Sequence, residues 1–128
     1  FFMKTCVVTA NFNCDPGKVW LYLTKPTLNH WRTDVKDYEE TPDGLQATEH
    51  NTDGKDTQLT FTRREKNRCV SCNFQKGKIH GTFTAILLGG GDSTSLECLL
   101  DVEGLGLFAK PKVLLEERLE MLRRALGA

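Results

Sequence analysis

The sequence predicts an α+β domain in which a seven-stranded, curved antiparallel sheet wraps around a long C-terminal helix, with two short helices after the first strand. Three observations predict it. The 128 residues are the usual size of one domain, so we expect a single unit over residues 1–128. From residue 35 to residue 103 apolar and polar side chains alternate in short runs separated by turn-forming residues. From Lys110 to Leu126 the apolar residues recur at helical spacing instead.

The first predicted strand runs from Lys4 to Phe12, where Val and Thr are frequent and the alternation is clear. Asp15 follows as a good N-cap, and Pro16 suits the first position of a helix. We expect that helix to end near Thr24, before Lys25-Pro26. A second short helix is expected across Pro26 to Trp31.

Six more strands are expected, and short turns rich in Gly, Asp and Asn join them. The expected strands are Val35–Glu40, Leu45–Asn51, Thr57–Lys66, Arg68–Gln75, Lys78–Leu88 and Thr94–Glu103. Because a parallel crossover needs about a dozen residues or more, such short links join antiparallel neighbours. The middle of the chain is therefore predicted to be a meander.

One face of this sheet carries most of its apolar side chains, and most charged residues have the opposite parity. The inner face is predicted to hold Leu59, Phe61, Val70, Cys72, Phe74, Phe83, Leu96, Cys98, Leu100 and Val102. The final helix presents Leu115, Leu119, Leu122 and Leu126 along one side. That apolar side has to be covered, and the sheet is the only large partner available.

Composition narrows the classes of partner. Lys and Arg number 17, as do Asp and Glu, so the formal net charge is zero and nucleic acid is not an expected partner. The beginning of the sequence lacks the pattern of a signal peptide, and no apolar run reaches the ~18 residues of a spanning helix. We expect a cytoplasmic protein without integral membrane association. Its five cysteines are an odd number and are expected to be reduced.

Two motifs could indicate functional sites, but we favour a purely structural interpretation of each. Cys69 and Cys72 form a CxxC, but in a strand residues three apart point to opposite faces, which argues against zinc or thiol redox chemistry. Gly89-Gly90-Gly91-Asp92 precedes a strand rather than a helix, so it indicates a hairpin turn and not a phosphate loop. We expect no metal and no cofactor. The basic run from Arg63 to Arg68 is interpreted as a solvated hairpin, with an acidic partner or a membrane surface as the alternative.

A resemblance to a known family is carried by Pro16-Gly17-Lys18-Val19-Trp20-Leu21-Tyr22-Leu23-Thr24, by Trp31 and by the strand that begins Asp34-Val35-Lys36-Asp37-Tyr38. With the strand count and the terminal helix, the sequence resembles the START-related polyketide cyclase and lipid-transfer superfamily, which has the helix-grip or birch-pollen-allergen-like fold. The resemblance implies an apolar cavity between the curved sheet and the long helix. The paired histidines and carboxylate that hold iron in the ring-hydroxylating oxygenases of that superfamily have no counterpart here.

The resulting hypothesis is a protein that binds a small apolar molecule, such as a lipid or polyketide, without catalysing a reaction. Tyr38 or Arg118 is the expected polar anchor. The expected wall consists of Trp31, Leu59, Phe61, Phe74, Phe83, Leu100, Phe108, Leu115 and Leu119. Small inward residues such as Cys72, Gly81 and Ala85 would leave room beside the aromatic rings.

Two other classes of function stay open from sequence alone. One is a cyclase-like, dehydratase-like or hydrolytic enzyme with an acid or base in the same cavity, for which Tyr38, Glu49 and His80 are candidates. His80 has outward parity, and neither His30 nor His50 sits in a nucleophile motif, so no catalytic residue is assigned. The other is a protein-interaction module with a filled core. Both monomer and homodimer remain open.

Overall fold

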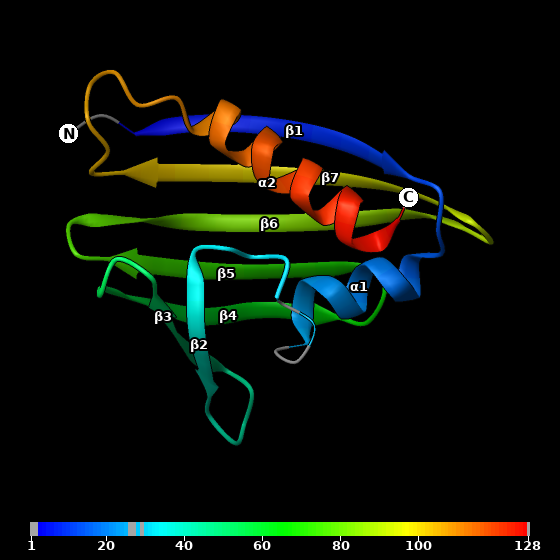
Figure 1. The fold of residues 1–128 in the computed structure, drawn as a ribbon, viewed down its shortest axis with the longest axis horizontal. Coiled ribbons are helices and arrows are strands. Elements are labelled where there is room, and N and C mark those ends of the chain that lie inside the picture. The colour runs from blue at the N-terminus through cyan, green and yellow to red at the C-terminus, as the bar shows by residue number, and fades with distance from the viewer. Residues whose placement is uncertain (1–2, 26–27, 29, 128) are drawn as a thin grey trace.

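The computed structural model describes residues 3–25, 28 and 30–127. It contains seven strands and two helices within these residues (Figure 1). In chain order they are β1 (Lys4–Phe12), α1 (Pro16–Thr24), β2 (Val35–Glu40), β3 (Gln46–Asn51), β4 (Asp56–Glu65), β5 (Cys69–Lys76), β6 (Ile79–Gly90), β7 (Ser93–Glu103) and α2 (Pro111–Leu126). The α+β class is confirmed. The second short helix expected over Pro26 to Trp31 includes Pro26, Thr27 and Asn29, which lie outside the described residues.

The strands form one antiparallel sheet in the order β1-β7-β6-β5-β4-β3-β2, which confirms the predicted meander. The first strand is the exception to the sequential order, because β1 pairs with β7 along its whole length, from Lys4 opposite Val102 to Phe12 opposite Thr94. The hairpin between β6 and β7 turns at Gly91, whose φ of 61° favours glycine. The glycine run is therefore a turn, as predicted.

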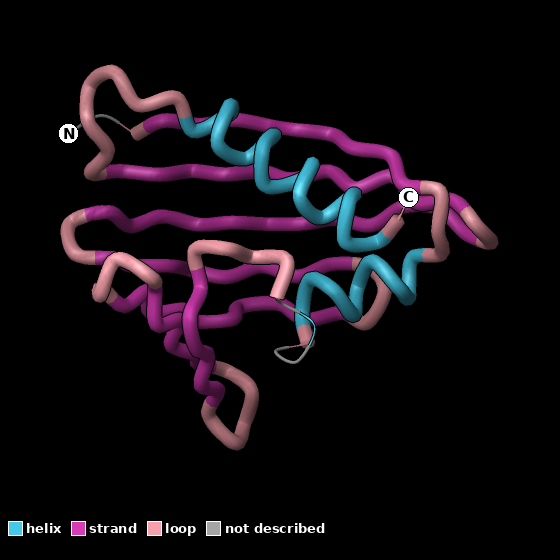
Figure 2. The backbone as a smooth tube through the Cα atoms, viewed as in Figure 1, coloured by secondary structure: helices cyan, strands magenta, loops and turns pink. Residues whose placement is uncertain are grey.

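Both helices lie on the same face of the sheet (Figure 2). The Asp15 carboxylate accepts a hydrogen bond from the Lys18 backbone N–H at 3.0 Å, which caps α1 as expected. Helix α2 ends at Gly127 in the left-handed conformation, where the glycine N–H reaches the carbonyls of Arg123 and Arg124. None of the helices in the described part of the chain is long and apolar enough to cross a membrane.

The core lies between α2 and the β1 side of the sheet. Leu115, Leu119, Leu122 and Leu126 of α2 are buried, as the helical spacing predicts. They pack with inner-face residues of the sheet and with α1, namely Cys6, Val8, Ala10, Phe12, Val19, Trp20, Val70, Ala85, Leu87, Leu96 and Cys98. Helix α2 packs chiefly along β1, and α1 stands beside its C-terminal end. The inner face of β4, β5 and β6 at the end away from α1 is therefore not covered by a helix.

Candidate ligand-binding hollow

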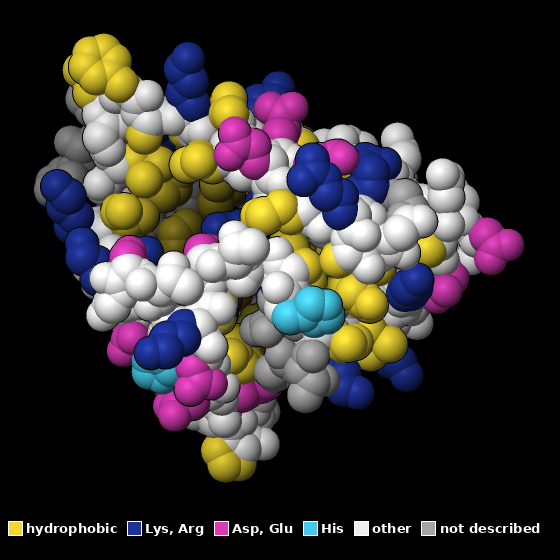
Figure 3. Space-filling view, in the orientation of Figure 1, with side chains coloured by type: hydrophobic (Ala, Val, Ile, Leu, Met, Phe, Trp, Pro, Cys, Tyr) yellow, Lys and Arg dark blue, Asp and Glu magenta, His cyan; other side chains and the backbone are white. Residues whose placement is uncertain are grey.

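The uncovered part of the inner face forms a hollow with an apolar floor (Figure 3). It opens between α2 and the segment that leads into β2. The strand register places five apolar side chains on this face that are only partly buried: Leu59, Phe61, Phe74, Phe83 and Leu100. Phe61, Phe83 and Leu100 also pack against the core, whereas Leu59 and Phe74 do not belong to it. All five were predicted as wall residues and lie on the predicted face.

The shape of the floor depends on Gly81 in β6. Gly81 lies opposite Phe74 of β5 and Val102 of β7. A Cβ at this position would collide with the backbone carbonyl of Asp101, so only glycine fits here. Because Gly81 carries no side chain, space remains beside the Phe74 ring, and both residues also border a depression on the outer face of the sheet.

A cluster of four charged side chains borders this floor. Arg32, just before β2, binds Asp34 through Nε and Nη2, at 3.0 Å to Oδ1 and 3.1 Å to Oδ2. It also binds Glu49 of β3 through Nη1 and Nη2, at 3.3 Å to Oε2 and 3.2 Å to Oε1. Arg118 of α2 reaches across to the same Asp34, with 3.0 Å between Nη2 and Oδ2. The cluster therefore joins α2, β3 and the segment before β2.

Arg32 and Glu49 are largely withdrawn from water, whereas Asp34 and Arg118 remain partly exposed. Burial disfavours the charged form of Arg32, but the charge of Glu49 and the hydrogen bonds to Asp34 outweigh burial and raise the Arg32 pKa. Burial likewise opposes ionisation of Asp34, yet the bonds and charge of Arg32, with the charge of Arg118, lower the Asp34 pKa. Burial and repulsion from Arg32 lower the pKa of Arg118. Asp34 is therefore ionised at neutral pH.

Two neutral groups stand next to this cluster on the inner face. Tyr38 of β2 lies opposite Glu49, and burial with the nearby charge of Glu40 raises the pKa of Tyr38 to about 12. Burial and the charge of Glu49 raise the pKa of Cys72 in β5 to about 11. Both groups therefore keep their protons at neutral pH, and neither supplies an anionic nucleophile there.

The other predicted site residues divide between rim, core and surface. Trp31 is half-buried, and its indole Nε1 donates to the Tyr22 carbonyl at 3.0 Å. Leu115 and Leu119 are buried in the core beneath α2. Phe108 is 89% exposed in the loop before α2, so its assignment to the wall is wrong. That loop is held instead by its backbone, since Lys4 Nζ donates to the carbonyls of residues 106, 107 and 109.

Glu49 of β3 is an exception to the mainly outward parity expected for charged residues. Glu49 shares its inward parity with Ala47 and Asn51, and all three are buried. The alternation along β3 already indicates in the sequence that Glu49 lies on the same face as Ala47 and Asn51. Arg32 and Asp34 gave no such signal, because they belong to a segment without regular alternation. His80 is exposed on the outer face as predicted, and it pairs with Glu103 at 3.1 Å.

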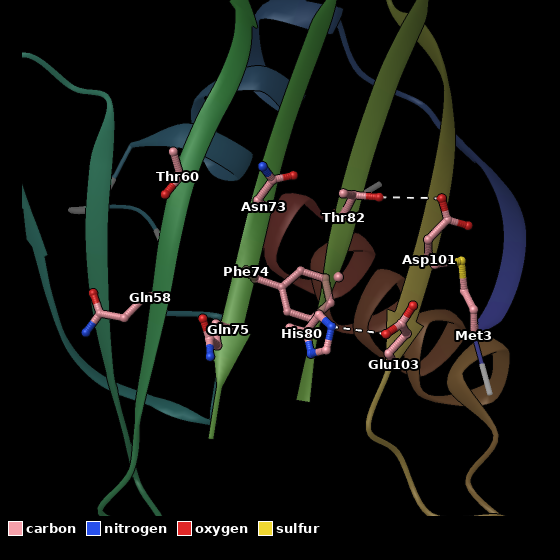
Figure 4. Close-up of a pocket in the computed structure, with 11 residues that line it drawn as sticks. Met3, Gln58, Thr60, Asn73, Phe74, Gln75, His80, Thr82, Asp101 and Glu103 are labelled. Carbon is pink, nitrogen blue, oxygen red and sulfur yellow. Dashed lines mark hydrogen bonds and ion pairs between the residues drawn. The ribbon is translucent and has the colours of Figure 1, made fainter. Parts of the chain in front are cut away.

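A second depression, of about 500 Å³, lies on the opposite, outer face of the sheet (Figure 4). Polar side chains of β4 to β7 line most of it, including Gln58, Asn73, Gln75, Thr82 and Asp101, and Phe74 and Gly81 also border it. The outward alternation of the strands already places polar residues here. The inner hollow is the better candidate site, because several half-buried apolar side chains lie on its face beside the charged cluster.

The cysteines show no arrangement typical of a redox or zinc site. Cys69 and Cys72 lie in β5 at positions three apart, as the strand interpretation requires. All five cysteines are free thiols. Within the described ranges no three His, Cys, Asp or Glu side chains cluster closely enough to hold a metal ion.

Replacing Asp34 with asparagine should make stability less dependent on acid pH. Since the Asp34 pKa is lowered by folding, its ionised form stabilises the protein above the unfolded value of about 3.9, and this stability is lost as the pH falls through the folded value. The variant should therefore be less stable than the wild type at neutral pH, with the gap closing in acid. Urea midpoints measured across acid and neutral pH check this. Asp37→Asn, at an exposed carboxylate of β2, is the control, and the same pH profile for both variants would contradict the expectation.

No protein-family model matches the sequence, and no curated protein matches it. Solved structures do match. A START superfamily protein from Mycobacterium smegmatis is 20% identical, with a TM-score of 0.72 over 95% of this chain and 93% of that one. CalU16 from Micromonospora echinospora is also 20% identical, with a TM-score of 0.73 over 96% of this chain and 76% of CalU16. DynU16, from the dynemicin biosynthetic locus, is 17% identical, with a TM-score of 0.78 over 97% of this chain, which spans only 47% of DynU16.

These proteins share little sequence with the chain, so the likeness rests on the arrangement of sheet and helices. Each of the three matches nearly all of this chain. The antiparallel order of seven strands and the terminal helix across their inner face are the features that the sequence resemblance implied. The chain therefore has a START-like fold.

Proposed function

We propose that this protein binds a small, mostly apolar molecule in the hollow between the inner face of the sheet and α2. One observation carries the proposal. Leu59, Phe61, Phe83 and Leu100 have inward parity and stay partly exposed, although residues of the same parity beneath α2 are buried. A ligand that covered these rings would gain about 25 cal/mol for each Å² of apolar surface removed from water. A filled core, as an interaction module would need, is disfavoured by the same exposure.

A cyclase-like, dehydratase-like or hydrolytic reaction in the same hollow is the second candidate. Tyr38 favours it, because a phenol that keeps its proton on the inner face is able to donate to a substrate oxygen. Glu49 is a poor general base, since both of its oxygens are bound by Arg32. Binding without chemical change is therefore the leading proposal. A change in the mass of the bound compound during incubation with the protein would favour the enzyme.

Substituting Phe74 with serine tests the location of the site. Phe74 is half-buried outside the core, so its loss should weaken binding of a neutral fluorescent probe such as N-phenyl-1-naphthylamine by about tenfold, the equivalent of roughly 1.4 kcal/mol. Fluorescence titration gives the dissociation constants, and native mass spectrometry of the purified protein shows whether a cellular compound co-purifies.

Gln75→Ser is the matched control, because Gln75 is the next residue of β5 and lines the outer depression, which Phe74 also borders, so it separates a ligand in that depression from one in the inner hollow. It should leave probe affinity within about twofold of the wild type, a difference below about 0.5 kcal/mol. Equal weakening by both variants, or no probe binding to the wild type and no co-purifying compound, would overturn the proposal.

A further inference from the structure

Each carboxylate oxygen of the charged cluster already accepts a hydrogen bond, whereas most of the unused donors of the cluster belong to Arg118. Each oxygen of Glu49 accepts from Arg32, and so does each oxygen of Asp34. Asp34 Oδ2 accepts a second bond, from Arg118. Arg32 has committed Nε, Nη1 and Nη2 to these carboxylates. Among the described residues, Arg118 makes only the one hydrogen bond, through Nη2. An arginine side chain has five N–H donors, so most of those of Arg118 remain for another acceptor.

Arg118 is well placed to meet a ligand in the hollow. It lies on α2 between the buried Leu115 and Leu119 and extends its guanidinium toward Asp34 beside the opening. Its side chain is 44% exposed, in contrast to 16% for Arg32. Figure 3 shows basic and acidic atoms next to the apolar floor. A molecule lying on that floor therefore has a charged donor within reach at its end.

We propose that Arg118 binds the carboxylate end of an amphiphilic ligand whose apolar body lies on the floor of the hollow. This inference rests on the proposed function and specifies the chemical class of its ligand. A carboxylate fits the planar fork of a guanidinium with two parallel hydrogen bonds, and such charge-assisted bonds are about twice as strong as neutral ones. An amine would have to compete with Arg32 for carboxylate oxygens that already accept from it. An alcohol would accept one hydrogen bond from Arg118 without the ionic attraction and without the second parallel bond.

Three twelve-carbon ligands separate these cases: dodecanoate, dodecanol and dodecylamine. Each is titrated at neutral pH, below its solubility limit and any critical micelle concentration, against protein loaded with N-phenyl-1-naphthylamine. We expect dodecanoate to bind the wild type about tenfold more tightly than dodecanol, a gain of roughly 1.4 kcal/mol, and dodecylamine to show no gain. Arg118→Gln should abolish the preference for dodecanoate and leave dodecanol affinity unchanged. Arg118→Lys, which keeps the charge without the fork, should retain part of the preference.

Arg124→Gln is the matched control, because Arg124 lies on the same helix, is exposed and loses the same charge on substitution. It should keep the wild-type preference. Equal affinity of the wild type for dodecanoate and dodecanol, tighter binding of dodecylamine, or an unchanged preference in Arg118→Gln would overturn the inference and leave the proposed function standing. Failure of the probe and all three ligands to bind the wild type would overturn the proposed function itself. Urea midpoints for each variant confirm that the comparison is made on folded protein.

Discussion

Replacing Arg32 with methionine is expected to lower the free energy of unfolding at neutral pH by about 3 kcal/mol. The side chains of Arg32 and Glu49 are only 16% and 11% exposed. The substitution therefore leaves the Glu49 carboxylate buried without its partner. The cost comes from that unpaired charge more than from the lost attraction. Urea denaturation at neutral pH measures the loss.

The double variant Arg32→Met with Glu49→Leu is the decisive companion, because it removes the stranded charge along with its partner. Buried ion pairs replaced by apolar residues of similar size are often neutral or even more stable. The double variant should therefore recover most of the stability that Arg32→Met loses. Arg63→Met, at an exposed arginine paired with Glu65, should change stability by less than about 1 kcal/mol. If Arg32→Met were as mild as Arg63→Met, the cluster would not be buried as the structure has it.

Shortening Leu122 to alanine should destabilise the protein by about 2–5 kcal/mol. Leu122 is 0% exposed at the centre of the apolar face of α2. Its removal takes apolar surface out of the core and leaves a cavity that rigid neighbours fill only in part. Thermal and urea unfolding followed by circular dichroism give the change.

Leu114→Ala provides the comparison, because Leu114 lies on the same helix and is 58% exposed. Surface substitutions of this kind usually change stability by no more than about 0.5 kcal/mol. A similar loss in both variants would mean that α2 is weakened as a helix and not through its packing on the sheet.

The regular elements were predictable because their signals are local. Alternation located Lys4–Phe12 and Val35–Glu40 with the bounds that the structure has, and Asp15-Pro16 marked the start of α1. Gly77 and Gly91 adopt positive φ in the hairpins where turn chemistry predicted them. The inner parity of Phe61, Phe74 and Phe83 followed directly, since register in a one-sided sheet is set by the apolar pattern.

The charged cluster was not predictable in the same way. Arg118 meets Asp34 across 84 positions of sequence, and only the path of α2 over the sheet brings them together. Asp34 and Arg32 lie in an irregular segment, where no periodicity indicates which way a side chain points. Phe108 did carry an apparent signal, because an aromatic residue near the final helix suggested burial. It falls instead in a loop whose polar backbone stays at the surface.

The pairing of β1 with β7 has a consequence for how the chain folds. Strands β2 to β7 are hairpin neighbours and need only short loops to close, so the meander can form from contacts that are local in sequence. Strand β1 pairs with β7, which ends only at Glu103, and is packed against α2, which ends only at Leu126. Strand β1 therefore cannot complete its contacts before these later segments are present. Bringing β1 and β7 together closes a long loop, and the entropy of that closure is lost before the contacts between them form. We therefore expect β1 and α2 to dock late in folding, which leaves the apolar inner face of the meander uncovered until then.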